Sequence, residues 1–267
     1  MNSKRMLLIM LLVGIILIYN YIQISKFYIN NVKLYSNKIS KSLKITQISD
    51  FHSNDKIDLN ELFNEIGEFE PNIIVLTGDI IDKKTENLDI VIKLLRRTKE
   101  ITDDVYFVSG NHEINNRLSE EFYNILEELG IKILDHKVEK IKINGDSINI
   151  FGVSFYANRD DFSLLYKNIS EKDYNLLLSH SPNRPINYLN ENIDLILSGH
   201  THGGQVRLPI IGGIVAPGQG FFPKYDKGLY KIENTVLYID SGLGNSALPI
   251  RMFNRVQISN IEVLPQE

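Results

Sequence analysis

Short apolar runs alternate with helical stretches along most of this 267-residue chain, and this alternation constrains the fold more than any other feature. Apolar or β-branched runs occupy residues 43–49, 73–77 and 105–109, and each ends in a polar cluster. Amphipathic stretches at residues 57–69 and 88–99 lie between them. Strands that alternate with helices predict an α/β fold with a mostly parallel sheet and right-handed crossovers.

The second half of the chain adds hairpins to this pattern. Asn144-Gly145 separates two strand-like runs, and Glu233-Asn234 separates two more, which predicts two antiparallel hairpins. A helical stretch at residues 118–129 continues the alternation. The strand-like runs of this half occupy residues 131–134, 138–143, 147–153, 174–179, 195–198, 228–232, 236–239 and 256–264. Two sheets packed face to face, with helices outside, would accommodate both halves.

The N-terminus differs from the rest of the chain in charge and hydropathy. Residues 1–49 contain seven basic and no acidic residues, and because the whole chain carries −4, the remainder carries −11. The run from Met6 to Tyr19 is apolar apart from Gly14, and with the apolar residues that follow it forms a helix of about 28 Å, close to the thickness of a bilayer core. No small-residue cleavage site follows it. Residues 1–25 are therefore interpreted as an uncleaved signal anchor, a single transmembrane helix in the cell membrane.

Residues 26–42 are interpreted as a Lys-rich juxtamembrane stalk. Its lysines could lie on anionic lipid headgroups, or the segment could be a solvated linker. Two basic residues precede the apolar run and five follow it, which favours a cytoplasmic C-terminal side. A short signal anchor with a basic N-terminus favours the opposite topology. The side of the membrane that carries residues 43–267 is left open.

Composition excludes several classes of protein. The chain has no Cys, which excludes a disulfide framework, a thiolate nucleophile and a Cys-ligated zinc, and leaves the redox compartment undetermined. The acidic body argues against a nucleic-acid partner bound through a basic face. Neither a Walker A sequence nor a G-x-S-x-G elbow occurs, which excludes the P-loop and serine-hydrolase interpretations.

Five polar clusters directly follow predicted strands. They are Asp50-Phe51-His52, Gly78-Asp79-Ile80-Ile81-Asp82, Gly110-Asn111-His112-Glu113, Ser179-His180 and Gly199-His200-Thr201-His202. Taken singly, each is typical of a turn or a helix cap. Because the carboxyl ends of parallel strands meet at one edge of a sheet, the five together predict a functional site. His136 lies outside these clusters and is interpreted as a surface residue.

The clusters offer carboxylate, amide and imidazole donors, which suit divalent metal ions. Seven donors exceed the needs of one four-coordinate ion but suit two ions that share a bridging carboxylate. The proposed ligands are Asp50, His52, Asp79, Asn111, His180, His200 and His202. Two ions about 3.5–4 Å apart can grip a phosphoryl oxygen and hold a hydroxide for in-line attack on phosphorus. Asp79 is the candidate bridge, and alternation would let His200 and His202 reach different ions.

The order D-x-H, G-D-x-x-D, G-N-H-E, a later H and G-H-T-H resembles the calcineurin-like metallophosphoesterases over residues 43–264. The continuation at residues 203–209, with Gly242-Leu243-Gly244 and residues 248–251, resembles the membrane-anchored bacterial branch of that family. That branch is similar to enzymes that hydrolyse simple phosphodiesters and, in some members, UDP-2,3-diacylglucosamine.

The resemblance implies a role for each cluster and a four-layer α/β/β/α sandwich for residues 43–267. One ion would be held by Asp50, His52 and His202, and the second by Asn111, His180 and His200, with Asp79 between them. His112 would stay unligated, stabilise the transition state and protonate the leaving oxygen. Manganese is the expected metal, with zinc or iron as alternatives.

Some positions depart from the family pattern. Glu113 replaces the commoner Asp at a position that usually supports the site rather than binding metal, and Asp240-Ser241 and Asn254-Arg255-Val256 also differ from relatives. Arg207 and Arg251 are the candidate substrate contacts, and a scaffold role is the alternative for each.

The sequence therefore predicts a membrane-anchored binuclear phosphoesterase that acts on phosphodiester or pyrophosphate bonds. Tethering suggests a lipid-linked or envelope phosphate ester as the substrate. A nucleotide-linked phosphate ester is the other expected partner. The alternatives are a catalytically silent metal-binding module and a nuclease of the same fold. The natural substrate and the oligomeric state are left open.

Overall fold

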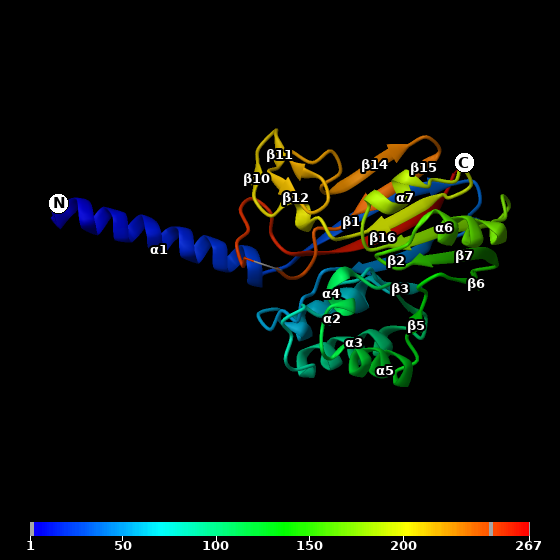
Figure 1. Ribbon diagram of the computed structural model, residues 1–267, viewed down its shortest axis with the longest axis horizontal. Helices are drawn as coiled ribbons and strands as arrows, with labels where there is room; N and C mark the ends of the chain where they lie inside the picture. The colour runs from blue at the N-terminus through cyan, green and yellow to red at the C-terminus, as the bar shows by residue number, and fades with distance from the viewer. Residues whose placement is uncertain (1–2, 246–247, 267) are drawn as a thin grey trace.

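Two six-stranded sheets packed face to face form the body of the protein, and helices cover both outer faces (Figure 1). The computed structural model describes residues 3–245 and 248–266, apart from the side chain of residue 168. This arrangement confirms the α/β sandwich expected from the sequence.

The first sheet has the strand order β1-β16-β2-β3-β4-β5. Its strands are β1 (Tyr28–Ser36), β16 (Gln257–Pro265), β2 (Leu43–Ile48), β3 (Ile73–Leu76), β4 (Val105–Phe107) and β5 (Lys132–Ile133). All neighbouring pairs are parallel except β16 with β2. Ile48 pairs with Leu76, and Leu76 pairs with Phe107, so the carboxyl ends of β2, β3 and β4 lie level with one another.

The second sheet has the strand order β14-β15-β9-β8-β7-β6. Its strands are β14 (Gly228–Ile232), β15 (Thr235–Ile239), β9 (Leu195–Ser198), β8 (Tyr174–Ser179), β7 (Asp146–Val153) and β6 (Lys137–Ile143). The four central strands are parallel, and a hairpin closes each edge. Both hairpins were predicted, and Asn144 (φ 57°) and Gly145 (φ 98°) have the positive φ angles that a tight hairpin turn requires.

Three hydrophobic layers hold the sandwich together. Ile45, Val75 and Tyr106 of the first sheet pack against Leu176 and Leu197 of the second, and all five are buried. The outer face of the first sheet is covered by α2 (Leu59–Phe69), α3 (Asp89–Ile101) and α5 (Ser119–Glu128). The outer face of the second is covered by α6 (Arg159–Leu165) and α7 (Asn183–Asn187). The one-turn helix α4 (Asn111–Ile114) follows β4 directly.

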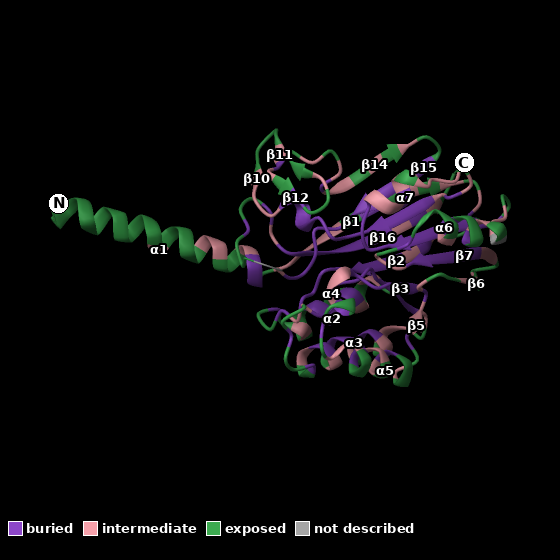
Figure 2. Cartoon of the chain, in the orientation of Figure 1, coloured by how far each residue is buried: buried purple, intermediate pink, exposed green. Residues whose placement is uncertain are grey.

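The N-terminal helix α1 (Ser3–Ser25) extends away from the body and is exposed along most of its length (Figure 2). An 18-residue window of α1 has a mean hydropathy of 2.3 and is only 6% buried, so α1 is long and apolar enough to cross a membrane. Its last turns are bound to the body. Asn20 Nδ2 donates to Pro249 O at 2.8 Å, and Phe253 N donates to Tyr19 Oη at 3.0 Å.

Within residues 26–42, which the sequence led us to interpret as a juxtamembrane stalk, Tyr28–Ser36 form β1, and β1 pairs with β16 over nine residues. The sequence hides this strand because it is a sheet edge that buries a single side chain, Val32, and carries Asn and Lys between its apolar residues. The segment after β9 was also not predicted as strands. It forms two small ribbons, β10 (Arg207–Leu208) with β11 (Gly212–Gly213), and β12 (Val215–Ala216) with β13 (Gly220–Phe221).

A chain that begins at residue 43 is expected to be less stable than one that begins at residue 26. Loss of β1 exposes the edge of β16 and removes Val32 and Leu34 from the core between the sheets. Burying one such side chain contributes roughly 1.5–3 kcal/mol, so the free energy of unfolding should fall by about 2 kcal/mol or more. Urea unfolding followed by circular dichroism measures the difference, and equal midpoints would contradict the structural role of β1.

Candidate metal centre

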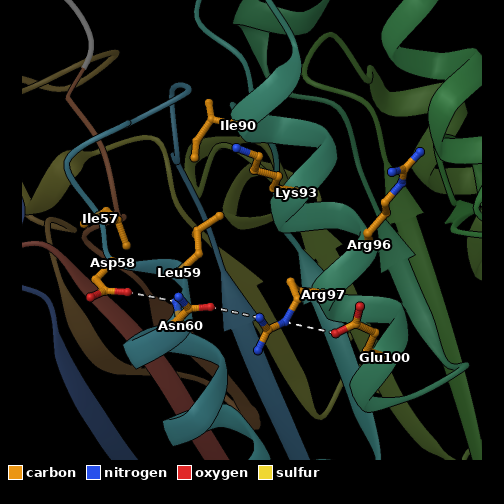
Figure 3. A pocket seen from close by; sticks show the side chains of 9 residues that line it. All are labelled: Ile57, Asp58, Leu59, Asn60, Ile90, Lys93, Arg96, Arg97 and Glu100. Carbon is orange, nitrogen blue, oxygen red and sulfur yellow. Dashed lines mark hydrogen bonds and ion pairs between the residues drawn. The ribbon is translucent and has the colours of Figure 1, made fainter.

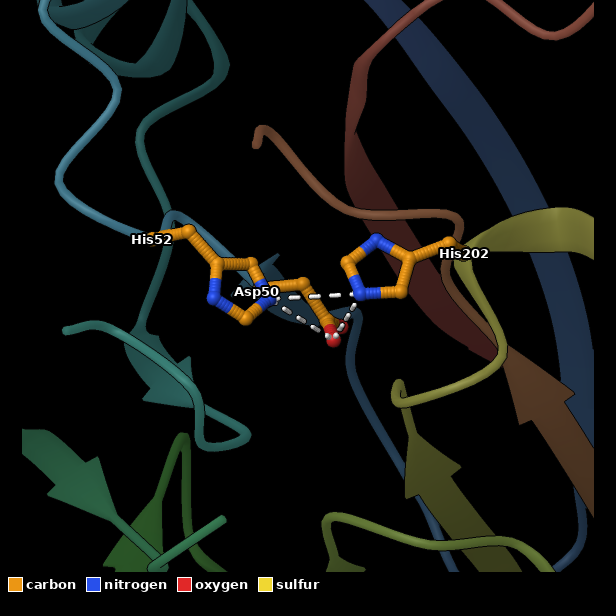
Figure 4. Close-up of side chains that lie close together, drawn as sticks. All are labelled: Asp50, His52 and His202. Atoms are coloured by element: carbon orange, nitrogen blue, oxygen red, sulfur yellow. Dashed lines mark hydrogen bonds and ion pairs between the residues drawn. The ribbon is translucent and has the colours of Figure 1, made fainter. Parts of the chain in front are cut away.

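Asp50, His52 and His202 form the first cluster of donor atoms (Figure 4). His52 Nε2 lies 3.2 Å from His202 Nε2, and these nitrogens lie 3.9 and 3.5 Å from Asp50 Oδ1. All three side chains are buried, and the two rings stack with centroids 5.0 Å apart. Two imidazole nitrogens and a carboxylate oxygen that point at one another in a buried site are suited to hold a cation.

Asp79, His180 and His200 form the second cluster. His180 Nε2 lies 3.1 Å from Asp79 Oδ2 and 3.1 Å from His200 Nδ1. The same Asp79 oxygen lies 3.8 Å from His52 Nε2, in the first cluster. Asp79 therefore lies between the two clusters, which is the place that a bridging carboxylate must take.

Asn111 provides a further candidate ligand. Its Oδ1 atom is buried and has no hydrogen-bond partner among the described residues. Buried amide oxygens are normally bonded, so an unpartnered one beside the clusters fits a metal ligand. Asn111 and His200 line the same cavity.

The structure thus brings all seven residues proposed from the sequence to one edge of the two sheets. His136 lies outside this group and bonds to Ser154 Oγ at 2.7 Å.

The backbone of the candidate ligands is held in an unusual conformation. Five of the seven have φ angles in the left-handed region, which non-glycine residues rarely adopt. They are Asp50 (48°), His52 (48°), Asp79 (52°), His200 (69°) and His202 (49°). Such residues cost about 1–3 kcal/mol each and persist where the surrounding structure demands them. The fold therefore accepts strain to turn these side chains toward one another.

Hydrogen bonds to neighbouring groups orient the imidazole rings. His180 Nδ1 lies 2.8 Å from the carbonyl oxygen of Thr77 and donates to it, which leaves Nε2 free to face Asp79 and His200. His52 Nδ1 lies 3.5 Å from Asp82 Oδ2, so the carboxylate faces the nitrogen that points away from the cluster. Partners of this kind determine which ring nitrogen is available to a metal.

Protonation of the histidines follows from their burial and neighbours. Burial and the adjacent His180 lower the pKa of His200 to about 3, so its imidazole is neutral at physiological pH. Burial opposes the charged form of His180, but the Asp79 carboxylate overrides it and raises the pKa of His180 to about 10. The same contact lowers the pKa of Asp79 despite its burial. A cation bound between these two residues would displace the proton that they share.

His112 faces the clusters from α4 and is bonded on its outer side. Its Nε2 lies 3.9 Å from Asp79 Oδ2, and its Nδ1 lies 3.0 Å from both Asp82 Oδ2 and Lys83 N. Nδ1 can donate to the carboxylate when the ring is protonated and accept from the amide when it is neutral. Both forms keep Nε2 directed toward Asp79. Asp82 is the last residue of the G-D-x-x-D motif, but the sequence alone did not predict its contact with His112. Its position three residues after Asp79 in that motif could have indicated a role in the site.

Glu113 supports the loop that carries Asp79. Its buried carboxylate accepts hydrogen bonds from Gly110 N at 2.8 Å, Asp79 N at 3.0 Å, Ile80 N at 2.5 Å and Ile81 N at 3.3 Å. Four donors and no acceptor suit the carboxylate anion, although burial beside Asp79 raises the pKa of Glu113 to about 7. Glu113 thus holds backbone in place and its oxygens are fully used, in agreement with the supporting position inferred from the sequence.

Glycine at position 110 is required by close packing. A Cβ atom there would lie 2.1 Å from Asp79 Oδ1 and 2.6 Å from Asp79 N. Both groups are held by hydrogen bonds, because Glu113 accepts from Asp79 N and His112 N donates to Asp79 Oδ1 at 2.9 Å. A Cβ atom could therefore be accommodated only if Asp79 were displaced from these bonds. The close approach of these two loops therefore depends on Gly110.

The arginines proposed as substrate contacts are engaged in the scaffold. Arg207 Nη1 bonds to Asp226 Oδ2 and to Gly203 O, both at 2.8 Å. Arg251 is 1% exposed, and its Nη2 donates to Ser241 O at 2.6 Å and to Gly244 O at 2.7 Å. The same nitrogen lies 3.3 Å from Nδ1 of His202. For both arginines the structure favours the scaffold role.

A different arginine lies at the edge of the clusters. A cavity of about 530 Å³ opens beside Asn111 and His200 and is also lined by Phe155, Tyr156 and Arg184. The guanidinium of Arg184 lies 5.9 Å from the centre of the Phe155 ring, and that ring lies 5.2 Å from the His200 ring. Sequence reasoning did not identify Arg184, because nothing in the short helix α7 distinguishes it from a surface residue.

A second groove, between α2 and α3, contains none of the candidate ligands (Figure 3). It has a volume of about 430 Å³. Asp58 caps α2 by accepting from Asn60 N at 2.9 Å, and Arg97 bonds to Asn60 Oδ1 at 3.1 Å and to Glu100 Oε2 at 3.0 Å. These polar groups bond to one another across the two helices.

Known proteins resemble this chain in sequence and fold. A model of the calcineurin-like phosphoesterase family matches residues 43–204. The metallophosphoesterase YkuE of Bacillus subtilis is 30% identical over 223 residues, which cover 81% of this chain and 77% of YkuE. A Danio rerio protein named transmembrane protein with metallophosphoesterase domain is 27% identical over 82% of this chain, and the chain spans about half of its length, 52%.

A solved structure shows the same fold at low sequence identity. The NAD nucleotidase NadN of Haemophilus influenzae matches 76% of this chain with a TM-score of 0.53 and 16% identity, and the chain spans less than half of it, 46%. Together with the family match and the clustered donors, these findings define the class. The chain belongs to the calcineurin-like phosphoesterase family, and it is a phosphoester hydrolase of a family that depends on two metal ions.

Gly110→Ala is expected to disable the centre without unfolding the protein, because the added methyl group displaces Asp79. A displacement of about 1 Å at reacting groups can cost about 100-fold in rate. Metal content by atomic spectroscopy and turnover of an aryl phosphodiester measure the effect. Gly67→Ala is the matched control, since a Cβ atom there meets only Ile101 at an ordinary 3.5 Å. Equal metal content and turnover in both variants would contradict the packing argument.

Proposed function

We propose that the protein is a membrane-anchored binuclear metal phosphoesterase that hydrolyses phosphodiester or pyrophosphate bonds of a lipid-linked or nucleotide-linked substrate. The observation that carries the proposal is the position of Asp79 Oδ2, 3.1 Å from His180 Nε2 in one cluster and 3.8 Å from His52 Nε2 in the other. A buried carboxylate shared by two sets of imidazoles suits two divalent ions a short distance apart.

The donor chemistry supports a ligand set divided in two. Asp50, His52 and His202 would hold one ion, His180, His200 and Asn111 the other, and Asp79 would bridge. Carboxylate, amide and imidazole donors without thiolate favour manganese, with zinc and iron as alternatives. When bound, the two ions supply Lewis-acid stabilisation of a phosphoryl oxygen and a nucleophile derived from water at neutral pH.

The residues around the metals provide orientation and proton transfer. His112 directs Nε2 toward Asp79, where the leaving oxygen of a phosphoester would lie, and its Nδ1 lies 3.0 Å from both Asp82 Oδ2 and Lys83 N. A protonated His112 can therefore donate its Nε2 proton to the leaving oxygen, while the Asp82 carboxylate stabilises the charged ring. Asp82 also faces His52 Nδ1, so it orients a proposed ligand as well.

The cavity beside His200 supports recognition of a second polar group on the substrate. Arg184 borders this cavity, and its guanidinium packs over Phe155. A guanidinium group can bind two oxygens of one phosphate, so Arg184 would suit a second phosphate of the substrate. The exposed ring of Tyr156 lies on the same wall. We therefore assign to Arg184 the substrate contact that the sequence had suggested for Arg207 or Arg251.

The helix α1 supports membrane anchoring. It is apolar and mostly exposed, and its last turns are bound to the body, as expected for a spanning helix with a catalytic domain at its end. A catalytic domain held at the bilayer would be exposed to a higher local concentration of lipid-linked phosphoesters than of soluble ones.

Asp79→Ala and His112→Ala are both expected to lose phosphodiesterase activity, but for different reasons. The full chain in detergent with Mn²⁺ should hydrolyse an aryl phosphodiester, and Asp79→Ala should lose both turnover and bound metal because the bridge is gone. His112→Ala should retain metal and lose about 10²–10⁴-fold in kcat, the usual contribution of a general acid. His136→Ala, outside the clusters, is the control. If Asp79→Ala and His112→Ala turn over at the rate of His136→Ala, the proposed function is wrong.

Arg184→Gln is expected to raise KM by about tenfold for a pyrophosphate-linked substrate, because a charged hydrogen bond to phosphate contributes about 1.5–3 kcal/mol. The effect should be smaller for a simple aryl phosphodiester, which has no second phosphate. Arg159→Gln, at an exposed position of α6, is the matched control. An equal KM for both variants on both substrates would exclude Arg184 from substrate binding.

A further inference from the structure

Large apolar side chains are exposed in two loops beside the end of α1. One loop connects β10 to β11, and the other precedes β16. We call these residues the apolar collar, and they are Leu208, Ile210, Ile211, Ile250, Met252 and Phe253. The two loops lie on the side of the body from which α1 leaves (Figures 1 and 2). Contiguous exposed apolar groups of this kind mark a contact with a partner or a membrane.

Contacts join the apolar collar to α1 in one continuous surface. Arg207 N donates to Met252 O at 2.9 Å, which ties the two loops together. The Phe253 ring lies 6.0 Å from the Tyr19 ring of α1. A cavity of about 570 Å³, with a nearly wholly apolar lining, separates residues 250–253 from Ile15 and Ile16 of α1. Whatever surrounds the exposed apolar surface of α1 at this end therefore also reaches the collar.

The backbone holds collar side chains outward at a conformational cost. Ile210 has a φ of 73° and Phe253 a φ of 51°. A left-handed conformation is rare for a β-branched residue and costs about 1–3 kcal/mol. Ile210 is fully exposed, so contacts within the protein do not offset this cost. Contact with an apolar phase outside the protein would offset it.

The charge around the apolar collar matches the surface of a bilayer. Residues 195–225 and 241–261, which contain both loops, have no Asp or Glu, although the chain has 33 acidic residues. Lys224 and Arg255 are basic residues of these segments, whereas Arg207 is paired with Asp226 and Arg251 is buried. Apolar side chains flanked by basic ones are typical of a surface that lies at the headgroup level of an anionic bilayer.

We propose that the apolar collar inserts into the headgroup and acyl boundary of the same bilayer that α1 spans, and thereby presents the metal centre to amphiphilic phosphoesters within that bilayer. The inference rests on the anchoring proposed above. A short chain of contacts links the two sites. Arg251 N donates to Asn20 Oδ1 of α1 at 2.9 Å, and the guanidinium of Arg251 lies 3.3 Å from Nδ1 of His202. One residue thus connects the base of α1 to a candidate ligand.

The absence of Trp from the chain permits a direct test. Three single variants of the full chain, Leu11→Trp in α1, Ile211→Trp in the collar and Leu164→Trp on α6, each carry one selectively excitable fluorophore. All three original residues are exposed, and α6 lies far from α1 (Figure 1). Each variant is reconstituted into vesicles of phosphatidylcholine and phosphatidylglycerol whose acyl chains are brominated, and quenching is compared with unbrominated vesicles.

The expected result is quenching of Leu11→Trp and Ile211→Trp but not of Leu164→Trp. Quenching of Leu11→Trp alone would support the insertion of α1 into the bilayer and would contradict the insertion of the apolar collar. Quenching of none would show that α1 does not insert, which overturns the anchoring and the collar together. Quenching of all three would overturn a specific docking face. A blue-shifted but unquenched Ile211→Trp would indicate a second copy of the chain as the occupant and would also overturn the proposal.

Turnover provides a second measurement that does not depend on Trp. Ile211→Glu is expected to lower the hydrolysis rate of a phosphodiester embedded in vesicles by about tenfold or more and to leave the rate on a soluble aryl phosphodiester unchanged. Leu164→Glu, an equally exposed Leu-to-acid change on α6, should alter neither rate. Equal rates for Ile211→Glu and Leu164→Glu on vesicles would overturn the collar. Loss of both activities in the unsubstituted chain would instead refute the proposed function.

Discussion

The structure depends on two carboxylates, Asp50 and Asp79, that are buried among imidazole rings at one edge of both sheets. Buried charge is tolerated only when it is paired, so the donors around these carboxylates must be supplied by the fold. The level carboxyl ends of β2, β3 and β4 deliver one half of the donors, and β8 and β9 of the facing sheet deliver the other half. The strained φ angles and the glycine at position 110 follow from bringing the two halves together.

A layer of supporting residues holds this arrangement. Glu113 bonds the backbone of the Asp79 loop, Asp82 faces two histidines, and Arg251 joins the loops that follow β15 to His202. Arg251 also contacts Asn20 of α1, so the base of the helix and the metal centre share one structural element. If α1 spans a membrane as proposed, this geometry would hold the candidate metal centre close to the bilayer, on the side of the body that carries the apolar collar.

Much of the fold was predictable because each predicted strand obeys a local rule. The buried strands are short apolar runs, and the Asn144-Gly145 pair strongly favours a tight hairpin turn. Strand β1 was missed because an edge strand buries little, so its polar residues resemble a linker. The ribbons β10 to β13 have two residues each, which is too short for any periodicity to be visible. Arg184 and Asp82 were missed as contacts because their roles depend on neighbours distant in sequence.

The sequence by itself determined which donors exist, in which order they occur, and that each follows a strand, because apolar periodicity and polar strand ends are local properties. The grouping of the donors and the bridging place of Asp79 were expected from the sequence and its family resemblance, and the tertiary structure supplied the distances between them. The tertiary structure alone decided that Arg251 is buried in the scaffold while Arg184 borders the cavity. It also decided that the apolar residues of two separate loops form one surface beside α1. These are distances between residues far apart in the chain, and such distances are set only when the two sheets pack against each other.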